Sequence, residues 1–420
     1  MFQQLLISNL SKDLVTNFQI LFSSLSIQEK PYSTGRPSCS RSALLNALVY
    51  KNLLSISTFA DLARNLKNNP EIAHICGFNK LPSKERFSAF IKDTPNEILQ
   101  SVRISLVHKL FSLKQIAGNY IAADSSSIKA NVKENNLKTN VKDRFNKSKL
   151  PKGDPDSRLG VIVTFPNNSK KIEFFWGYKN HILIDAKSEL PIAEFTTTAD
   201  VHDSNLIIPN LKFIINNFKF KIKAVIADSA FDSANILSFI INELNASPII
   251  SRNIRNNHVS SNFSLSSKGI PICLAGFHMI SRGSYFDKSQ NRTRHKFVCP
   301  IKSSRKLAKK LGWVCPWNHP NFFKNKLGCT VNLRIDKDIR QKITYGSQSF
   351  KKLFKLRSAI ERTFSRLLSI CMQQSNVYGL QSFSNICTIA HITVLSIALL
   401  AVSTGNSDKS RFIKKFFQKA

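Results

Sequence analysis

The hydrophobic pattern changes its period near residue 119, and this change limits the folds that the chain can form. Before it, apolar residues recur every three or four positions, which is typical of amphipathic helices. The predicted helices cover residues 42–54, 58–69, 83–93 and 96–113. After it, short runs rich in Ile, Val and Phe are typical of strands. The predicted strands cover residues 119–128, 159–165, 172–186, 191–199, 223–230 and 247–251.

Two further helices, at about 203–218 and 232–244, alternate with the last strands. This order predicts the α/β class, with a mixed sheet that follows an all-α N-terminal domain. The next stretch lacks regular periodicity, and we interpret it as an insertion because an ordered loop of that length is unusual. A helix with one apolar stripe is then predicted at 351–370. The predicted parts are 1–115, 116–251, the insertion 252–345, 346–405 and a basic tail at 406–420.

Basic residues are in large excess over acidic ones. The chain has 61 Lys and Arg against 26 Asp and Glu, a formal net charge of +35 at pH 7. Such an excess repels itself unless a polyanion shares the surface. Nucleic acid is the favoured partner, since neutralising phosphates releases counterions and strengthens binding. An anionic membrane or a structural basic protein is less favoured, because the basic residues form neither one tail nor one amphipathic face.

No export or membrane signal is found in the sequence. The N-terminus lacks the basic region and small-residue cleavage site of a secretory signal. The longest apolar stretch, 388–403, contains His391 and is shorter than the roughly 20 residues of a membrane span, so we expect a buried helix. Eight cysteines without an export signal favour a reducing compartment over a disulfide framework. The prediction is a cytoplasmic protein without membrane contact.

Three acidic residues stand where apolar or basic ones are expected. Asp124 and Asp228 each end an apolar run, and Glu361 lies in a helix among arginines. Singly, each has an ordinary structural interpretation, since aspartate often closes a strand or caps a helix and Glu361 can pair with Arg357 one helical turn away. Together they could supply the carboxylates that metal-dependent phosphoryl transfer needs, provided that the fold brings them to one place.

Five motifs carry a resemblance to a known family. In chain order they are "IAADSSSI", "GYKNHILIDA", "TTTADVHDSN", "VIADSAFDS" and "LRSAIERTFSRL", with a long insertion before the last. The chain is similar in these motifs to bacterial insertion-sequence transposases of the DDE type. Upstream, "TGRPSCSRSALLNALVYKNLLSISTFADLARNL" resembles the helical N-terminal domain of those proteins, so that the likeness covers about residues 34–400.

The resemblance implies a ribonuclease-H-like catalytic core and a two-metal mechanism. Asp124, Asp228 and Glu361 would be the three catalytic acids and would bind Mg²⁺, with Mn²⁺ as an alternative. The expected reaction is hydrolysis at the transposon ends followed by strand transfer into target DNA. Expected partners are double-stranded DNA, as terminal inverted repeats and target, and a second copy of the chain in the DNA complex. The N-terminal domain would bind DNA ends or dimerise, in a bacterial protein associated with the nucleoid.

One branch of the family surrounds its glutamate with a Tyr-x2-Arg-x3-Glu-x6-Lys signature. Here Arg357 and Glu361 match, whereas Phe354 and Leu368 stand at the tyrosine and lysine positions. The two departures put in doubt the phosphate contacts of the signature and the hairpin-forming route to double-strand breakage.

Basic residues near the acids are candidate DNA contacts. We expect Arg357 to clamp a backbone phosphate, and Arg362 or Arg366 to supply the charge of the missing lysine. Lys179 lies on a strand expected beside that of Asp124 and is a further candidate.

Other polar residues have competing interpretations. Asp200 and Asp203 flank His202, and we interpret them as a loop entering a helix N-cap, with Asp232 supporting the neighbouring Asp228. Four cysteines fall in the insertion, and their spacing lacks the close Cys-x2–4-Cys pairs of ordinary zinc sites. Reduced, buried thiols are the favoured interpretation and a structural zinc site is the alternative. The four are Cys273, Cys299, Cys315 and Cys329.

Two other functions fit the same motifs. A ribonuclease-H-like nuclease would cut DNA without joining it. A catalytically inactive, basic DNA-binding protein, such as a decayed transposase, would keep the acids for structural reasons. Spacing along the chain cannot separate these alternatives from a transposase.

Overall fold

The computed structural model divides into two compact units. Unit 1 comprises Met1–Ser251 and Thr344–Ala420, and unit 2 comprises Arg252–Ile343. The helical N-terminal region and the sheet thus belong to the same unit. The structure describes residues 12–31, 34, 39–164, 167, 169–253, 263–266, 270–290, 292–316, 322–323, 325–334, 339–370, 372–373, 376–413 and 416–417.

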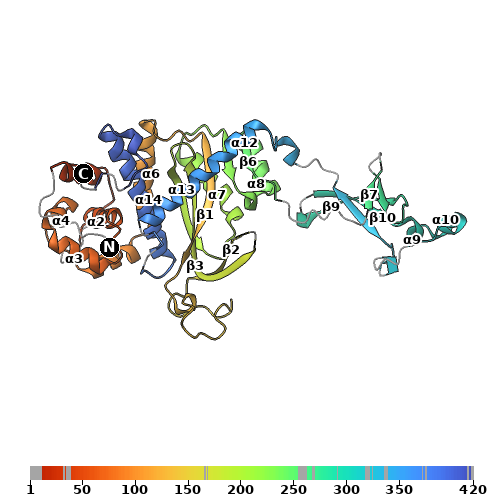
Figure 1. Cartoon of the computed structure of the whole chain (residues 1–420), viewed down its shortest axis with the longest axis horizontal. Helices are drawn as coiled ribbons and strands as arrows, with labels where there is room; N and C mark the ends of the chain where they lie inside the picture. Colours follow the sequence, from red (N-terminus) through yellow and green to blue (C-terminus); the bar gives the residue numbers. More distant parts are fainter. Residues whose placement is uncertain are drawn as a thin grey trace. The chain divides into compact units, whose positions relative to one another are not determined.

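Helices form the N-terminal part of unit 1 (Figure 1). They are α1 Lys12–Ser23, α2 Arg41–Leu53, α3 Phe59–Asn68, α4 Pro70–Cys76, α5 Lys84–Asp93 and α6 Asn96–Ser112. The side chains of Ser40 and Thr58 cap α2 and α3, each by accepting from the backbone amide three residues further on. Between the helices predicted at 58–69 and 83–93, the structure contains a further helix, α4, that the sequence did not predict. Pro70 begins α4, at a position where its missing N–H leaves no helical hydrogen bond unmade.

The sheet of unit 1 has six strands, and its order explains how the acids approach one another. The strands are β1 Tyr120–Lys129, β2 Arg158–Thr164, β3 Lys171–Asp185, β4 Leu190–Thr198, β5 Ala224–Ala227 and β6 Ser247–Ile250. Their order is β2-β3-β1-β5-β6, and β4 also pairs with β3. β1, β3 and β4 pair antiparallel, whereas β1, β5 and β6 pair in parallel. This is the predicted ribonuclease-H-like mixed sheet, preceded by an all-α region.

Helices after the strands pack against this sheet (Figure 1). They are α7 Ile207–Asn217, α8 Ala234–Ser238, α12 Gln348–Phe354, α13 Ser358–Ser369 and α14 Leu380–Ser403. The single helix predicted at 351–370 is in fact two, because a 3₁₀ turn at Lys355–Arg357 separates α12 from α13. The apolar side of α13 is buried, and the helix contacts β1.

α14 is the one described helix long and apolar enough to cross a membrane, yet most of it is buried in the protein. Polar side chains on it bond to the sheet. Thr388 Oγ1 donates to Glu194 Oε1 at 2.6 Å, and His391 Nε2 lies 3.1 Å from Asn180 Oδ1. A buried polar group needs such partners, so these bonds fix α14 as a core helix and confirm the predicted buried helix at 388–403.

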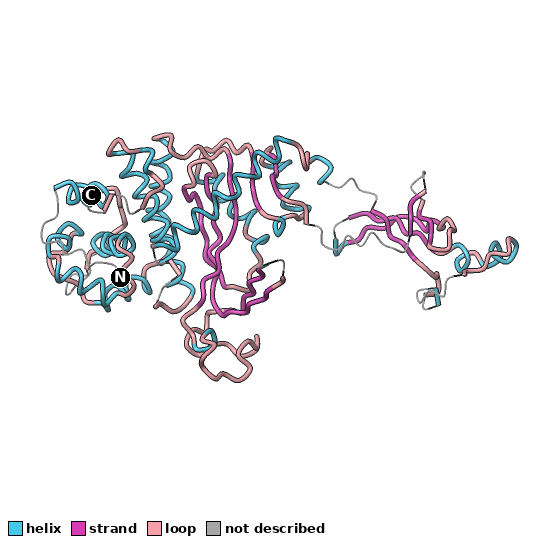
Figure 2. Tube along the Cα trace, in the orientation of Figure 1, coloured by secondary structure: helices cyan, strands magenta, loops and turns pink. Residues whose placement is uncertain are grey.

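Unit 2 contains more regular structure than the sequence predicted. Its strands are β7 Phe263–Leu265, β8 Pro271–Cys273, β9 Ile280–Asp287, β10 Arg292–Val298 and β11 Thr330–Arg334, and its helices include α9 Pro300–Ser303 and α10 Arg305–Lys310. β9, β10 and β11 form an antiparallel sheet, drawn in magenta in Figure 2. The hydrophobic pattern missed β10 because it reads Arg-Thr-Arg-His-Lys before its first apolar residues.

Candidate active site

Asp124 and Asp228 lie on adjacent parallel strands at the same level. The pairing of β1 with β5 runs from Tyr120 opposite Ala224 to Ala122 opposite Ile226. Two residues further along each strand, this register reaches Asp124 and Asp228. The backbone of Asp228 is extended, with φ −78° and ψ −179°, and continues the line of β5. Since side chains two residues apart share a face of a strand, the two carboxylates are presented together.

Each aspartate is also held by a local hydrogen bond. Asp124 Oδ1 accepts from the amide of Ser125 at 2.8 Å. Asp228 Oδ1 accepts from the amide of Ala230 at 2.8 Å and caps the short 3₁₀ helix Ser229–Phe231. The capping interpretation of Asp228 is therefore correct, and it is compatible with a functional one because the cap orients the carboxylate next to Asp124.

The surroundings of Asp124 raise its pKa to about 7. Burial is the largest cause, and the nearby carboxylates of Asp228 and Asp203 add repulsion. The Ser125 amide and the Arg357 guanidinium act in the opposite direction. A cation among these carboxylates would favour their ionised forms, and carboxylate oxygens are the ligands that Mg²⁺ prefers. The residues at this edge of the sheet therefore fit a divalent ion.

Glu361 lies in the first turn of α13 and is bound to an arginine. Arg357 Nη2 donates to Glu361 Oε1 at 2.6 Å, and the glutamate side chain is 55% exposed. The same Arg357 interacts electrostatically with Asp124, so it links the glutamate to the aspartates. Across the residues that the structure describes, no group of three or more His, Cys, Asp or Glu is arranged to hold a metal ion. A role for Glu361 as third ligand stays a prediction.

Asp203 is a neighbour of the site that the sequence reasoning missed. Lys179 Nζ lies 3.1 Å from Asp203 Oδ1 and donates to the carbonyl of Val201 at 3.1 Å. His181 Nδ1 lies 3.7 Å from the same carboxylate oxygen. Burial, the largest cause, lowers the pKa of His181 to about 4, so its ring is neutral at pH 7. A signal was available, because Lys179 and His181 alternate on one face of a strand beside β1.

These contacts change the interpretation of Lys179. Its side chain is only 14% exposed, and its ammonium is paired with Asp203. A lysine held in this way is placed to position Asp203 beside Asp124, and its contact with DNA stays a prediction.

Arg362 and Arg366 also have partners other than those predicted. Arg362 Nη2 lies 2.8 Å from Glu189 Oε1, and Arg366 Nη2 lies 3.0 Å from Glu189 Oε2. Glu189 is almost fully buried in the turn between β3 and β4, and Thr363 Oγ1 donates to its carbonyl at 3.0 Å. These two arginines therefore anchor α13 to the sheet in this structure, and their phosphate contacts stay a prediction.

The comparisons with known proteins decide the family. The model of the transposase DDE domain matches residues 121–395, and that of a transposase domain (DUF772) matches residues 12–93. The chain belongs to the DDE transposases. The first match extends from β1 through the two aspartates and α13 into α14. Its function is that of a DNA transposase, an enzyme acting on DNA.

Other comparisons add little to this assignment. No curated protein matches the transposase. Among solved structures, the cryo-EM structure of a piggyBac transposase synaptic complex with hairpin DNA is similar, with a TM-score of 0.36 and 13% identity. That likeness covers 97% of this chain and 78% of the other.

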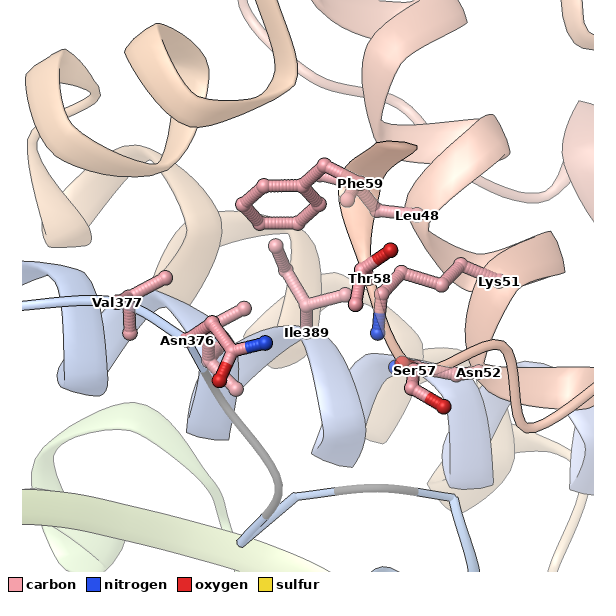
Figure 3. Close-up of a pocket in the computed structure, with 10 residues that line it drawn as sticks. Leu48, Lys51, Asn52, Ser57, Thr58, Phe59, Asn376, Val377 and Ile389 are labelled. Carbon is pink, nitrogen blue, oxygen red and sulfur yellow. The ribbon is translucent and has the colours of Figure 1, made fainter. Parts of the chain in front are cut away.

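A small cavity in the transposase lies away from the aspartates. It has a volume of about 30 Å³ and is lined by side chains of α2, α14 and the segment between α2 and α3. Figure 3 shows Lys51, Thr58 and Phe59 around it. This volume is close to that of one water molecule, so the cavity is too small for a substrate.

The cluster around Asp203 gives a first prediction. Asp203→Asn is expected to lower the turnover of DNA-end cleavage by about tenfold, because Lys179 loses its charged partner and Asp124 one of its neighbours. The matched control is Asp200→Asn, an exposed aspartate three residues earlier that is expected to keep wild-type turnover. Single-turnover cleavage of end-containing DNA measures both variants. Equal rates for Asp203→Asn and wild type would contradict a role for Asp203 at the site.

Proposed function

We propose that the transposase cuts DNA at the ends of its element and joins them to target DNA at a site built on Asp124 and Asp228. The observation that carries this proposal is the parallel register of β1 and β5, which sets the two carboxylates side by side. The raised pKa of Asp124, which burial causes first and the carboxylates of Asp228 and Asp203 add to, supports it, since perturbed pKa values cluster at functional sites.

Divalent ions, Mg²⁺ or Mn²⁺, would be held by Asp124 and Asp228, with Glu361 as the third ligand. When bound, they would activate the attacking oxygen and stabilise the leaving 3′-oxygen. Asp124 would give up its proton as they bind, because the positive charge of the cations would offset the burial and the repulsion that raise its pKa. The hydrogen bonds from Ser125 and Ala230 would keep both carboxylates oriented.

The Arg357–Glu361 pair would change partners during the reaction. With Glu361 engaged at the site, the Arg357 guanidinium is free to bind a phosphate of the scissile strand. A planar guanidinium matches the geometry of phosphate oxygens and stays protonated, so it suits this role. Release of DNA would return Arg357 to Glu361, the arrangement that the structure shows.

The proposed chemistry has two steps, hydrolysis and strand transfer. Water attacks the phosphorus at the transposon end, the bond to the 3′-oxygen breaks, and a 3′-hydroxyl and a 5′-phosphate result. That 3′-hydroxyl then loses its proton and attacks the phosphorus of a target phosphodiester. The bond between this phosphorus and the 3′-oxygen of the target breaks, and that oxygen takes up a proton to become a new 3′-hydroxyl. Joining two ends to one target requires two sites, so we propose a homodimer on terminal inverted repeats and target DNA.

An assay on linear DNA tests this function. The substrate carries the inverted repeats that flank the reading frame, and a second, labelled duplex serves as target. With Mg²⁺ or Mn²⁺ we expect cleavage at the ends and a labelled product that contains both DNAs. Cleavage without joining would indicate a nuclease. Binding to the ends without cleavage in either metal would indicate a catalytically inactive DNA-binding protein, and either result would overturn the proposal.

A further inference from the structure

Four cysteines of unit 2 come from four separate segments. Cys273 ends β8, Cys299 caps α9, Cys315 follows α10, and Cys329 precedes β11. Cys299 is buried, and the other three are half-buried. They lie far apart in the sequence, so only the folding of unit 2 can bring them together.

Cys299 and Cys329 meet at the end of a strand pair. The antiparallel pairing of β10 with β11 ends with Val298 opposite Thr330, and the next residue beyond each is a cysteine. The backbone confirms the close approach, because a Cβ on Gly328 would lie 2.8 Å from the Cβ of Cys299. Gly328 has a φ of +68°, which favours glycine and allows the chain to turn past Cys299.

Aromatic packing brings the segments that contain Cys273 and Cys315 close to Cys299 and Cys329. The amide of Cys273 donates to the carbonyl of Phe277 at 3.0 Å, which closes a tight turn. The ring of Phe277 lies 5.4 Å from that of Trp313, two residues before Cys315. The strand that follows this turn begins at Ile280, which pairs with Val298 directly before Cys299. The Cys329 thiol accordingly lies close enough to the other three to interact with them electrostatically.

Unit 2 has little hydrophobic core to hold these segments in place. Among its described residues, the buried apolar ones are Pro271, Met279, Val298, Cys299, Pro300 and Ala308. A domain with so small a core usually needs disulfides or a metal for stability. The sequence favours a reducing compartment, where disulfides rarely form, so a bound metal would be the remaining way to stabilise unit 2.

We propose that Cys273, Cys299, Cys315 and Cys329 bind one structural Zn²⁺ that holds unit 2 together. Four thiolates in a closed tetrahedral set are a standard structural zinc site. In the described structure the thiols are not yet arranged for coordination. Zinc would replace the four thiol protons, which are released to solvent.

The metal content of the purified transposase tests this site. Full-length protein expressed with added zinc, and purified with a reductant but without chelator, is expected to contain about one Zn²⁺ per chain. Cys299→Ser and Cys329→Ser are each expected to lower this content at least fivefold. Cys39→Ser is the matched control, since Cys39 is a half-buried free thiol of unit 1, and it should keep the full content.

A second measurement applies even if a variant folds poorly. Wild-type protein is labelled with iodoacetamide, with and without a zinc chelator, and its peptides are analysed by mass spectrometry. We expect the four cysteines to be protected together and to become reactive together on chelation. Wild-type protein without zinc, or zinc that persists in both serine variants, would overturn the proposal. Neither readout depends on DNA cleavage, so this proposal and the proposed active site can fail separately.

Discussion

Asp228→Asn is expected to abolish DNA cleavage and strand transfer while leaving the fold intact. The amide removes the negative charge that a divalent ion needs, and loss of an essential ligand costs about a thousandfold or more in rate. Asparagine caps helices as well as aspartate does, so the hydrogen bond from Ala230 can remain. The measurement is single-turnover cleavage in Mg²⁺ and Mn²⁺, with circular dichroism to verify folding.

Asp143→Asn is the charge-matched control for this variant. Asp143 is exposed and pairs with Lys149, away from the sheet, so its loss should leave cleavage unchanged. If Asp228→Asn cleaves as fast as this control, the assignment of Asp228 is wrong. Binding of end-containing DNA should be similar in both variants, which separates loss of chemistry from loss of substrate.

Asp124→Asn should be equally inactive, and its stability should respond to pH in a definite direction. Folding raises the pKa of Asp124 from 3.8 to about 7. The folded state then holds a proton more tightly than the unfolded state, so stability falls as pH rises through this window. The stability of the Asp124→Asn variant does not fall with pH in this way, because asparagine does not titrate. In chelator-treated protein, its Tm relative to wild type should therefore increase between pH 5 and pH 8, which thermal melts at several pH values can check.

Glu189→Gln is expected to weaken both the fold and the activity. Glu189 accepts ion pairs from Arg362, Arg366 and Arg411, and its side chain is 7% exposed. Of the three arginines only Arg366, which is 14% exposed, is left largely buried without its partner, so the cost should lie below the about 3–5 kcal/mol of a fully buried pair. We expect a fall of several degrees in Tm and a cleavage rate lower by tenfold or more, since α13 carries Glu361 and is anchored at this point.

The control for Glu189 is Glu173→Gln. Glu173 pairs with Lys129 on the surface, where the two side chains are 46% and 52% exposed, and such a pair contributes about 0–1 kcal/mol. The Glu173→Gln variant should have the Tm and the cleavage rate of the wild type. For Glu189→Gln, the KM for DNA should change less than kcat, because the anchor positions α13 and does not itself contact the substrate. An unchanged kcat with a lower Tm would show a purely structural role.

The sequence predicted the sheet well because its strands are buried apolar runs that turn residues interrupt. It also identified Asp124 and Asp228, since each ends such a run, and the parallel register then placed them together. It interpreted Asp203 only as part of a loop entering a helix, and it did not single out Glu189. Their partners are distant along the chain, and no local pattern reports a tertiary ion pair. The break at Lys355–Arg357 escaped notice because an apolar stripe continues through it.

Unit 2 is inserted into unit 1 between the strand β6 and the helix α12. β6 ends at Ile250, directly before unit 2 begins, and α12 begins at Gln348, soon after it ends. The two elements contact each other, so both junctions are held beside a single strand of the catalytic sheet. Closing a longer loop between fixed ends costs little additional entropy. We therefore expect that a domain of another size could replace unit 2 at this insertion point without moving the aspartates.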